Sequence, residues 1–224
     1  WLVSNPENTA AFSAIGYSFA KYLNKVLNIP IGIINTSWGG SPAEAWTDKQ
    51  TLENNFKKSE IRNNNNKAVH HNPSGLFNGM ISPLIPFKIK GAIWYQGESN
   101  TGRASSYTKL INTMIKGWRN QWGQGDFPFY FVQIAPNGSV GNGDGTSQAF
   151  LREAQLKTML SLKNTGMAVT LDVGSKITNH PQEKIIVGKR LAYWALAKNY
   201  GFDTLPFSGP VYESIDVKKD KVYV

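Results

Sequence analysis

The stretch Gly91-Ala-Ile-Trp-Tyr-Gln-Gly-Glu-Ser-Asn100 changes abruptly from apolar residues to amide, carboxylate and hydroxyl side chains. A continuous apolar run of this kind predicts a strand that is buried on both faces, as strands of parallel sheets are. Ligands of open α/β sheets bind in the crevice beyond the carboxyl ends of the strands. Gln96, Glu98, Ser99 and Asn100 therefore lie where a functional site is expected, although an ordinary polar loop would also account for the pattern.

Further predicted strands and helices alternate along the chain. The apolar runs at residues 31–34, 129–134 and 167–172 predict three more strands. Helical spacing of apolar residues, or residues typical of a helix start, predict helices at residues 9–28, 105–122, 148–162 and 181–199. Strands that alternate with helices of this length favour a parallel sheet with helices on both faces, which is a three-layer α/β/α domain.

The pattern changes after Gly209-Pro210. Residues 211–217 alternate between apolar and polar side chains, Lys218-Lys-Asp-Lys221 is typical of a turn, and a second short strand follows at 222–224. We therefore expect residues 1–209 to form the α/β domain and residues 210–224 to form a β-hairpin that starts a β-rich domain.

Composition narrows the function classes. The 224 residues suffice for one large domain with a sizeable core, and no apolar run is long enough to span a membrane. The absence of cysteine excludes disulfides, thiolate metal sites and a cysteine nucleophile. A net charge of +9 would suit an anionic partner, but the basic residues are scattered in short pairs, so nucleic-acid binding is not expected. Because no spacing of two histidines and a carboxylate occurs, neither a metal nor another cofactor is expected.

Three of the expected strand ends carry candidate groups. The pair Gly39-Gly40 is either a turn or a place where backbone N–H groups approach an anion closely. Gln96 is either a satisfied buried amide or a donor to a developing oxyanion. His180, between a strand end and a helix start, is the best-placed candidate for a general base. His70 and His71 lie in a polar loop and are weaker candidates.

Several blocks of the chain resemble the sialate O-acetylesterase family of the SGNH hydrolase superfamily. They comprise residues 32–46, 76–84, 93–100, 152–155 and 172–184. The run Trp94-Tyr-Gln-Gly-Glu-Ser-Asn100 is long and chemically unusual, and is therefore specific. The resemblance covers nearly the whole chain up to Gly209. It implies a flavodoxin-like fold, hydrolysis of acetyl esters on sugars through a serine nucleophile and an acyl-enzyme, and a periplasmic or secreted location.

The resemblance also implies roles for single residues. His180 would be the general base, and Gly40 or Gly39 would supply a backbone donor to the oxyanion. Gln96 would replace the asparagine that other SGNH enzymes use as the third oxyanion donor. These roles agree with the chemistry of ester hydrolysis, which needs a base and preorganised donors around a forming alkoxide.

The triad acid departs from the pattern of the superfamily. Many SGNH enzymes have Asp three residues before the histidine, and here that position is Ile177. Asp172, at the expected strand end, is one candidate to orient His180, and a backbone carbonyl, leaving a Ser-His dyad, is another. Glu98 is a further candidate, although we expect it mainly to organise the loop of Gln96.

The nucleophile is the second departure. In the family it lies in a Gly-Gln-Ser-Asn-Met block on a strand that precedes the first helix found here, and no such block occurs in the 224 residues. We therefore expect residues 1–209 to be a catalytic domain whose nucleophile strand comes from a missing N-terminal segment of the same protein. Ser37, Ser41 and Ser99 are alternative nucleophiles, but none has the context of a nucleophile elbow.

The expected partner is an acetylated carbohydrate, with Trp38, Trp94 and Asn100 as substrate contacts. A non-catalytic sugar-binding module on the same scaffold is the alternative. Trp46 and Tyr95 would join Trp38 and Trp94 as its stacking platforms.

Overall fold

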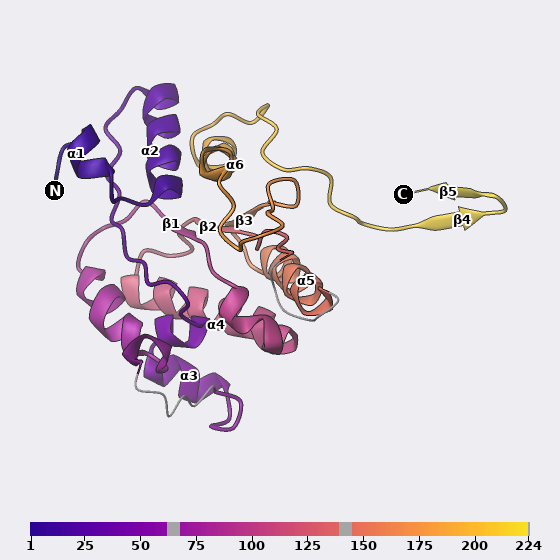
Figure 1. The fold of residues 1–224 in the computed structure, drawn as a ribbon, viewed down its shortest axis with the longest axis horizontal. Coiled ribbons are helices and arrows are strands. Elements are labelled where there is room, and N and C mark those ends of the chain that lie inside the picture. The colour runs from indigo at the N-terminus through magenta and orange to yellow at the C-terminus, as the bar shows by residue number, and fades with distance from the viewer. Residues whose placement is uncertain (62–67, 139–144, 224) are drawn as a thin grey trace.

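Three parallel strands form the centre of the molecule (Figure 1). The structure is a computed structural model that describes residues 1–61, 68–138 and 145–223. Strand β1 (Ala92–Trp94) pairs with β2 (Phe129–Val132), and β2 pairs with β3 (Thr165–Ala168). Trp94 lies opposite Phe131, so the polar residues that follow β1 lie at the carboxyl edge of the sheet.

Helices cover both faces of this sheet. Helices α2 (Ala14–Leu27) and α6 (Lys184–Asn199) pack together on one face, and α6 contacts β2 and β3. Helices α4 (Ala104–Trp122) and α5 (Thr146–Ser161) pack on the other face, where α3 (Lys49–Asn55) joins α4. The predicted three-layer α/β/α fold is confirmed.

Strand β2 shows why its sequence is continuously apolar. Phe129 and Phe131 enter the core between the sheet and α4, whereas Tyr130 and Val132 enter the core on the α6 side. All four side chains are buried. Since successive side chains of a strand point to opposite faces, only a strand covered on both sides buries every residue.

The predicted helices are largely confirmed, with one error at the N-terminus. The helix expected at residues 9–28 is two helices, α1 (Pro6–Thr9) and α2. Ser13, not Thr9, caps α2, because its Oγ accepts the N–H of Gly16 at 3.1 Å. Asn28 ends α2 in a left-handed conformation.

The strand expected at residues 31–34 is not a strand in the structure, so this prediction is wrong. No backbone hydrogen bond joins residues 31–34 to any other part of the described chain. Apolar β-branched residues favour a strand, but a strand exists only where a neighbour completes its hydrogen bonds. The expected fourth strand is also displaced, since β3 ends at Ala168 and does not reach Asp172.

Short helices lie in the connections between these elements. They are η1 (Ala43–Trp46), η2 (Val69–His71), the π-helix η3 (Phe77–Ile81), η4 (Ser82–Leu84) and η5 (Glu98–Arg103). The block 76–84, one of those that carry the family resemblance, contains η3 and η4.

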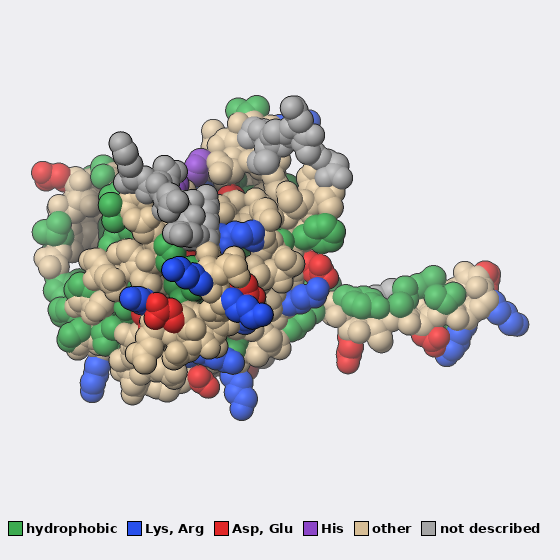
Figure 2. Space-filling view, turned by 90° about the horizontal axis from the view of Figure 1, so that it is seen from below, with side chains coloured by type: hydrophobic (Ala, Val, Ile, Leu, Met, Phe, Trp, Pro, Cys, Tyr) green, Lys and Arg blue, Asp and Glu red, His purple; other side chains and the backbone are tan. Residues whose placement is uncertain are grey.

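The C-terminal residues extend away from the α/β body (Figures 1 and 2). Strands β4 (Asp216–Lys218) and β5 (Lys221–Tyr223) form an exposed antiparallel hairpin. Its first strand is much shorter than the alternation at residues 211–217 predicts, since residues 211–215 are not in a strand. That residues 210–224 start a separate β-rich domain stays a prediction.

The charged side chains do not form one continuous patch on the face drawn in Figure 2, where Lys and Arg lie scattered among acidic residues. Among the helices of the described residues, none has the length and apolar character that crossing a membrane requires.

Candidate active site

A cavity of about 600 Å³ lies beyond the carboxyl end of β1. Residues 33–41 and 93–99 form two of its walls, and residues 179–184 contribute to a third. Seven of the nine predicted site residues line it: Trp38, Gly39, Gly40, Trp94, Gln96, Glu98 and His180. Asp172 and Asn100 do not. The structure therefore brings together groups from three separate parts of the sequence.

Gly39 and Gly40 line this cavity and carry backbone N–H groups that could act as donors. Neither N–H group has an acceptor within the described part of the chain. Gly40 has a φ of +72°, a conformation that glycine adopts without strain. Its carbonyl accepts the Ser99 hydroxyl at 2.7 Å, which ties the glycine loop to the loop after β1. Adjacent free N–H groups of this kind form an anion-binding concavity.

Gln96 is a fully bonded amide in this conformation. Its Nε2 donates to the Ser41 carbonyl at 3.2 Å and to Asn100 Oδ1 at 2.7 Å, which uses both amide hydrogens. The Tyr107 hydroxyl lies 3.0 Å from its Oε1. Gln96 can donate to an oxyanion only after it releases one of these acceptors, so that role stays a prediction.

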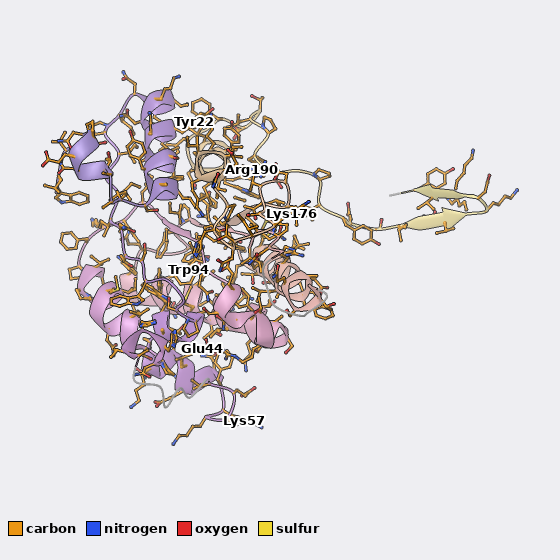
Figure 3. The ribbon with its side chains drawn as sticks, in the orientation of Figure 1. Tyr22, Glu44, Lys57, Trp94, Lys176 and Arg190 are labelled. Carbon is orange, nitrogen blue, oxygen red and sulfur yellow. The ribbon has the colours of Figure 1, made fainter. Side chains whose placement is uncertain are left out.

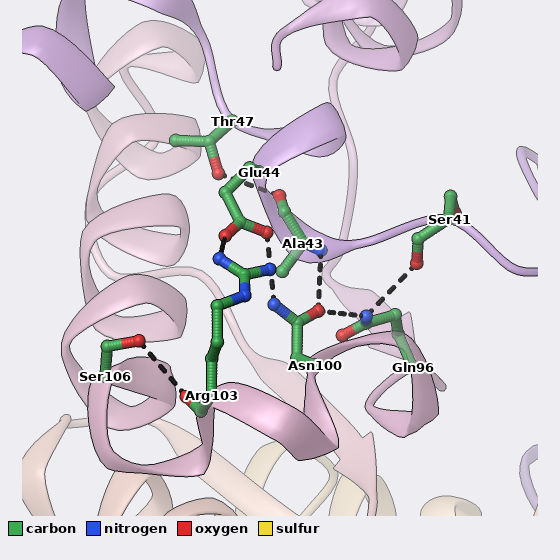
Figure 4. A network of polar contacts seen from close by, with 8 residues as sticks. All are labelled: Ser41, Ala43, Glu44, Thr47, Gln96, Asn100, Arg103 and Ser106. Carbon is green, nitrogen blue, oxygen red and sulfur yellow. Dashed lines mark hydrogen bonds and ion pairs between the residues drawn. The ribbon is translucent and has the colours of Figure 1, made fainter. Parts of the chain in front are cut away.

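Asn100 does not line the cavity but belongs to a network of polar contacts with Gln96, Ala43 and Glu44 (Figure 4). The residue is only 2% exposed, and its Oδ1 also accepts the N–H of Ala43 at 3.0 Å. Its Nδ2 donates to Glu44 Oε2 at 3.1 Å. Asn100 therefore connects the loop after β1 to η1, and its expected contact with substrate stays a prediction.

Glu44 and Arg103 were not singled out by the sequence analysis. The Glu44 carboxylate is 3% exposed and pairs with the guanidinium of Arg103 at the end of η5 (Figure 4). A buried carboxylate is tolerated only when it is paired and hydrogen-bonded. The available signal was a lone acidic residue within the apolar run Ala43-Glu-Ala-Trp46.

The loop after β1 turns closely over helix α5. An added Cβ at Gly97 would lie 2.5 Å from Ile134 Cγ2 and 2.8 Å from Leu151 Cδ2, so only glycine fits. Gln155 Nε2 donates to the Gln96 carbonyl at 3.2 Å, and its Oε1 accepts the N–H of Ile134 at 2.9 Å. Gln155 thus joins the loop after β1 to the residues that follow β2 and fixes the distance between them.

Asp172 has a different partner from the one expected. Its two carboxylate oxygens accept Nη1 and Nη2 of Arg190 at 2.6 and 2.5 Å. These bonds hold the pKa of Asp172 below its ordinary value. Arg190 lies on α6, on the opposite side of the sheet from Glu44 (Figure 3). The structure thus pairs Asp172 with Arg190 and not with His180, and its role as triad acid stays a prediction.

Glu98 is the carboxyl group of this cavity whose pKa is affected by His180. Burial raises the pKa of Glu98, while the positive charges of His180 and Lys184 act in the opposite direction. Burial also lowers the pKa of Lys184, whose Nζ lies 5.4 Å from the centre of the Tyr95 ring. Glu98, His180 and Lys184 line the same cavity, so a carboxylate and two basic groups meet there.

The three candidate serines within the chain are committed to other partners. The hydroxyl of Ser37 donates to Asn35 Oδ1 at 2.5 Å. Those of Ser41 and Ser99 donate to the carbonyls of Trp38 and Gly40, each at 2.7 Å. A hydroxyl has a single proton, so none of these serines is arranged to give it to His180.

Trp38 and two histidines lie together at this end of the molecule. The Trp38 ring stacks on His70 with 5.5 Å between the ring centres, and His70 contacts His71 edge-on at 4.2 Å. Among the described residues, no three His, Cys, Asp or Glu side chains gather in a way that could hold a metal ion.

The sequence profile of the family described as "carbohydrate esterase, sialic acid-specific acetylesterase" matches residues 4–197. The chain therefore belongs to this family of carbohydrate esterases. It is 33% identical to human sialate O-acetylesterase over 226 residues and 31% identical to the mouse protein over 254 residues. These alignments cover 93% and 94% of this chain but 43% and 47% of the relatives, so the chain spans less than half of their length.

Two solved structures are similar to this one. A carbohydrate acetylesterase from Xanthomonas citri shares 40% identity with a TM-score of 0.86, over 96% of this chain and 47% of that one. A protein from Arabidopsis thaliana shares 24% identity with a TM-score of 0.57, over 82% of this chain and 68% of the other, and this likeness concerns the fold alone. The first likeness agrees with the predicted flavodoxin-like architecture of SGNH hydrolases.

The buried position of Glu44 predicts the effect of removing its partner. Arg103→Ala leaves a buried carboxylate without a counter-charge and should lower the free energy of unfolding by about 3 kcal/mol. Arg190→Ala is the matched control, because its partner Asp172 is mostly exposed and the loss should be about 1 kcal/mol or less. Urea unfolding of both variants measures the difference, and equal small losses would contradict the role given to Glu44.

The raised pKa of Glu98 predicts a pH-dependent stability. The unfolded chain releases this proton near the ordinary value of 4.5, whereas the folded protein holds it to higher pH. The penalty for ionising the buried carboxyl therefore appears as the pH rises above 4.5 and is complete above the folded-state pKa.

Glu98→Gln removes this penalty. The melting temperature of the variant relative to the wild type should thus be higher at about pH 8 than at about pH 4. Glu153→Gln, at an exposed position, is the control and should show no such rise. A relative melting temperature of Glu98→Gln that stays constant or falls with pH would contradict the assignment.

Proposed function

We propose that this chain forms most of the active site of an esterase that removes O-acetyl groups from sugars through a serine nucleophile and an acyl-enzyme. The observation that carries the proposal is the cavity that His180 shares with the free N–H groups of Gly39 and Gly40. A base and preorganised donors around one space are what acyl transfer requires. The names of the relatives, sialate O-acetylesterase and carbohydrate acetylesterase, support an acetylated sugar as substrate.

In the proposed reaction, a serine Oγ attacks the acetyl carbonyl carbon while His180 accepts the hydroxyl proton. The N–H groups of Gly40 and Gly39 donate to the oxyanion of the tetrahedral intermediate. Gln96 adds a third donor once its Nε2 releases the carbonyl of Ser41, the longer of its two bonds. The C–O bond to the sugar then breaks, and His180 returns the proton to the departing sugar hydroxyl.

The acetyl-enzyme is hydrolysed by the same groups. Water attacks the acyl carbon as His180 takes one of its protons, and the oxyanion again binds at Gly39 and Gly40. The bond between the serine Oγ and the acyl carbon then breaks, His180 returns its proton to Oγ, and the acetic acid leaves and ionises to acetate. Glu98 lines the same cavity as His180, and we assign it the role of stabilising the imidazolium that is expected of a triad acid.

The nucleophile, in this proposal, comes on a strand from a segment of the protein outside these 224 residues. A second cavity, of about 320 Å³, is lined mainly by apolar residues and shares Ile33, Ile34, Thr36, Ile93 and Trp94 with the first. The two cavities run between residues 31–36 and the outer edge of β1, which has no strand partner among the described residues. A strand in this space would pair with residues 31–36 on one side and with β1 on the other. Its end would lie at the cavity that contains His180.

The family resemblance also supports a periplasmic or secreted location, which we include in the proposal. The sugar-binding module without catalysis is less well supported, because stacking on aromatic rings needs neither free N–H groups nor a base. Its aromatic candidates Trp46 and Trp94 are moreover packed edge-on against each other, with ring centres 5.8 Å apart.

Substitutions in the complete protein test the assigned roles. His180→Ala should lower kcat on an acetylated sugar at least about a hundredfold because it removes the base. Gln182→Ala, an exposed neighbour, should leave kcat unchanged. Hydrolysis at the wild-type rate by His180→Ala would contradict the mechanism.

Gln96→Ala should lower kcat about a hundredfold or more if its amide reaches the oxyanion. Tyr107→Phe removes a hydrogen bond from the same amide without removing the donor, and should affect the melting temperature more than kcat. A purely structural Gln96 would show the reverse pattern, with a lower melting temperature and an unchanged kcat.

Covalent labelling tests the origin of the nucleophile. A fluorophosphonate should label the complete protein once, at a serine outside these 224 residues, and the isolated chain should stay unlabelled. Peptide mass spectrometry locates the label. Modification of Ser37, Ser41 or Ser99 would contradict the proposed strand, and a complete protein that does not react would favour the non-catalytic alternative.

A further inference from the structure

Trp38 is an exposed aromatic residue of the candidate site. Its side chain is 53% exposed, although it lines the cavity that contains His180. The exposed part of the indole is apolar surface that a bound ligand could bury. One face of the indole is covered by His70, whose ring is tilted by only 24° from it.

The short helix that contains His70 is itself held in place by hydrogen bonds. His70 belongs to the short helix η2, in which the N–H of Asn72 donates to the Val69 carbonyl at 3.0 Å. Just beyond it, the N–H of Ser74 donates to the Glu44 carbonyl at 2.9 Å. An added Cβ at Gly75 would lie 2.9 Å from the Val69 oxygen, so glycine permits this close turn. The turn after η2 and the loop after β1 are therefore both hydrogen-bonded to Glu44.

The ring lies one residue from the proposed oxyanion donors. Gly39 and Gly40 follow Trp38 directly, and the Trp38 carbonyl accepts the Ser41 hydroxyl at 2.7 Å, which closes the loop tightly. A group bound against the indole is thus adjacent to the place where an acetyl carbonyl would react. The C–H face of a pyranose ring is flat and apolar enough to pack on an aromatic face.

We propose that Trp38, backed by His70, is the platform on which the sugar ring of the substrate stacks, and that His70 is the positioning residue that keeps the indole in place. This inference rests on the proposed esterase function, and it adds the subsite that recognises the sugar. It assigns recognition of the ring to Trp38 and leaves the reaction of the acetyl group to other residues.

The test compares two acetate esters in the complete protein. O-acetylated xylo-oligosaccharide carries a sugar ring, whereas trifluoroethyl acetate carries the same acetyl group without a ring. The measured quantity is the ratio of kcat/KM for the first ester to kcat/KM for the second. Trp38→Ala should lower this ratio about tenfold and His70→Ala about threefold, through KM for the saccharide.

Two control variants separate positioning from folding. His70→Phe keeps a flat ring beneath the indole and should keep the wild-type ratio. Val69→Ala changes an exposed residue of the same short helix and should also leave the ratio unchanged.

An unchanged ratio in both Trp38→Ala and His70→Ala would overturn the proposal. So would an equal effect of Val69→Ala and His70→Ala, because it would show that only the turn matters. If the wild type hydrolyses neither ester, the esterase function fails separately. Calorimetric titration with the deacetylated saccharide then decides: binding lost in Trp38→Ala but kept in Val69→Ala supports the platform, and binding kept in both refutes it.

Discussion

The buried carboxylate of Glu44 joins three segments that are distant in the sequence. Its side chain binds Asn100 and Arg103 from the loop after β1, and its backbone carbonyl accepts Ser74 from the turn after η2. An ionised carboxylate in the interior is stable only while these partners stay in place. The requirement to satisfy one buried charge therefore fixes the positions of the loops that surround the cavity.

This constraint extends to the groups with proposed chemical roles. Asn100 holds Gln96, Gln96 holds the carbonyl of Ser41, and the Ser99 hydroxyl holds the carbonyl of Gly40. These bonds hold the loop that contains Gly39 and Gly40, whose N–H groups are the proposed oxyanion donors. Donors that need no reorganisation during the reaction are the most effective in stabilising developing charge. A rigid frame of this kind is also compatible with the exposed indole of Trp38, which stacks on the ring of His70.

Much of the fold was predictable because it follows from local patterns. Helix α4 and strand β2 were found within a few residues, since their apolar positions repeat at the spacing that burial demands. Residues 31–34 carry an equally apolar pattern but lack a partner, and no local pattern reveals whether a neighbouring strand is present. The start of α2 was missed because Thr9 and Ser13 are both good caps, and the choice between them depends on tertiary packing.

The candidate site was predicted unevenly for the same reason. Residues that follow β1 directly, such as Gln96 and Glu98, can be located from the sequence because a parallel sheet places all strand ends at one edge. Pairings over a distance cannot: Asp172 binds Arg190 on a following helix, and Glu44 binds Arg103 across 59 positions. The sequence likewise does not reveal that the two amide hydrogens of Gln96 are donated to Ser41 and Asn100.

The central claim is that one cavity combines the base His180 with oxyanion donors at Gly39 and Gly40. A crystal structure of the complete protein after reaction with an organophosphonate tests it most directly, because the bound phosphoryl group imitates the tetrahedral intermediate. We predict a phosphoryl oxygen within hydrogen-bond distance of the Gly40 N–H and the imidazole of His180 beside the modified serine oxygen. A phosphoryl group bound away from both, with Gly39 and Gly40 still facing empty space, would contradict the account.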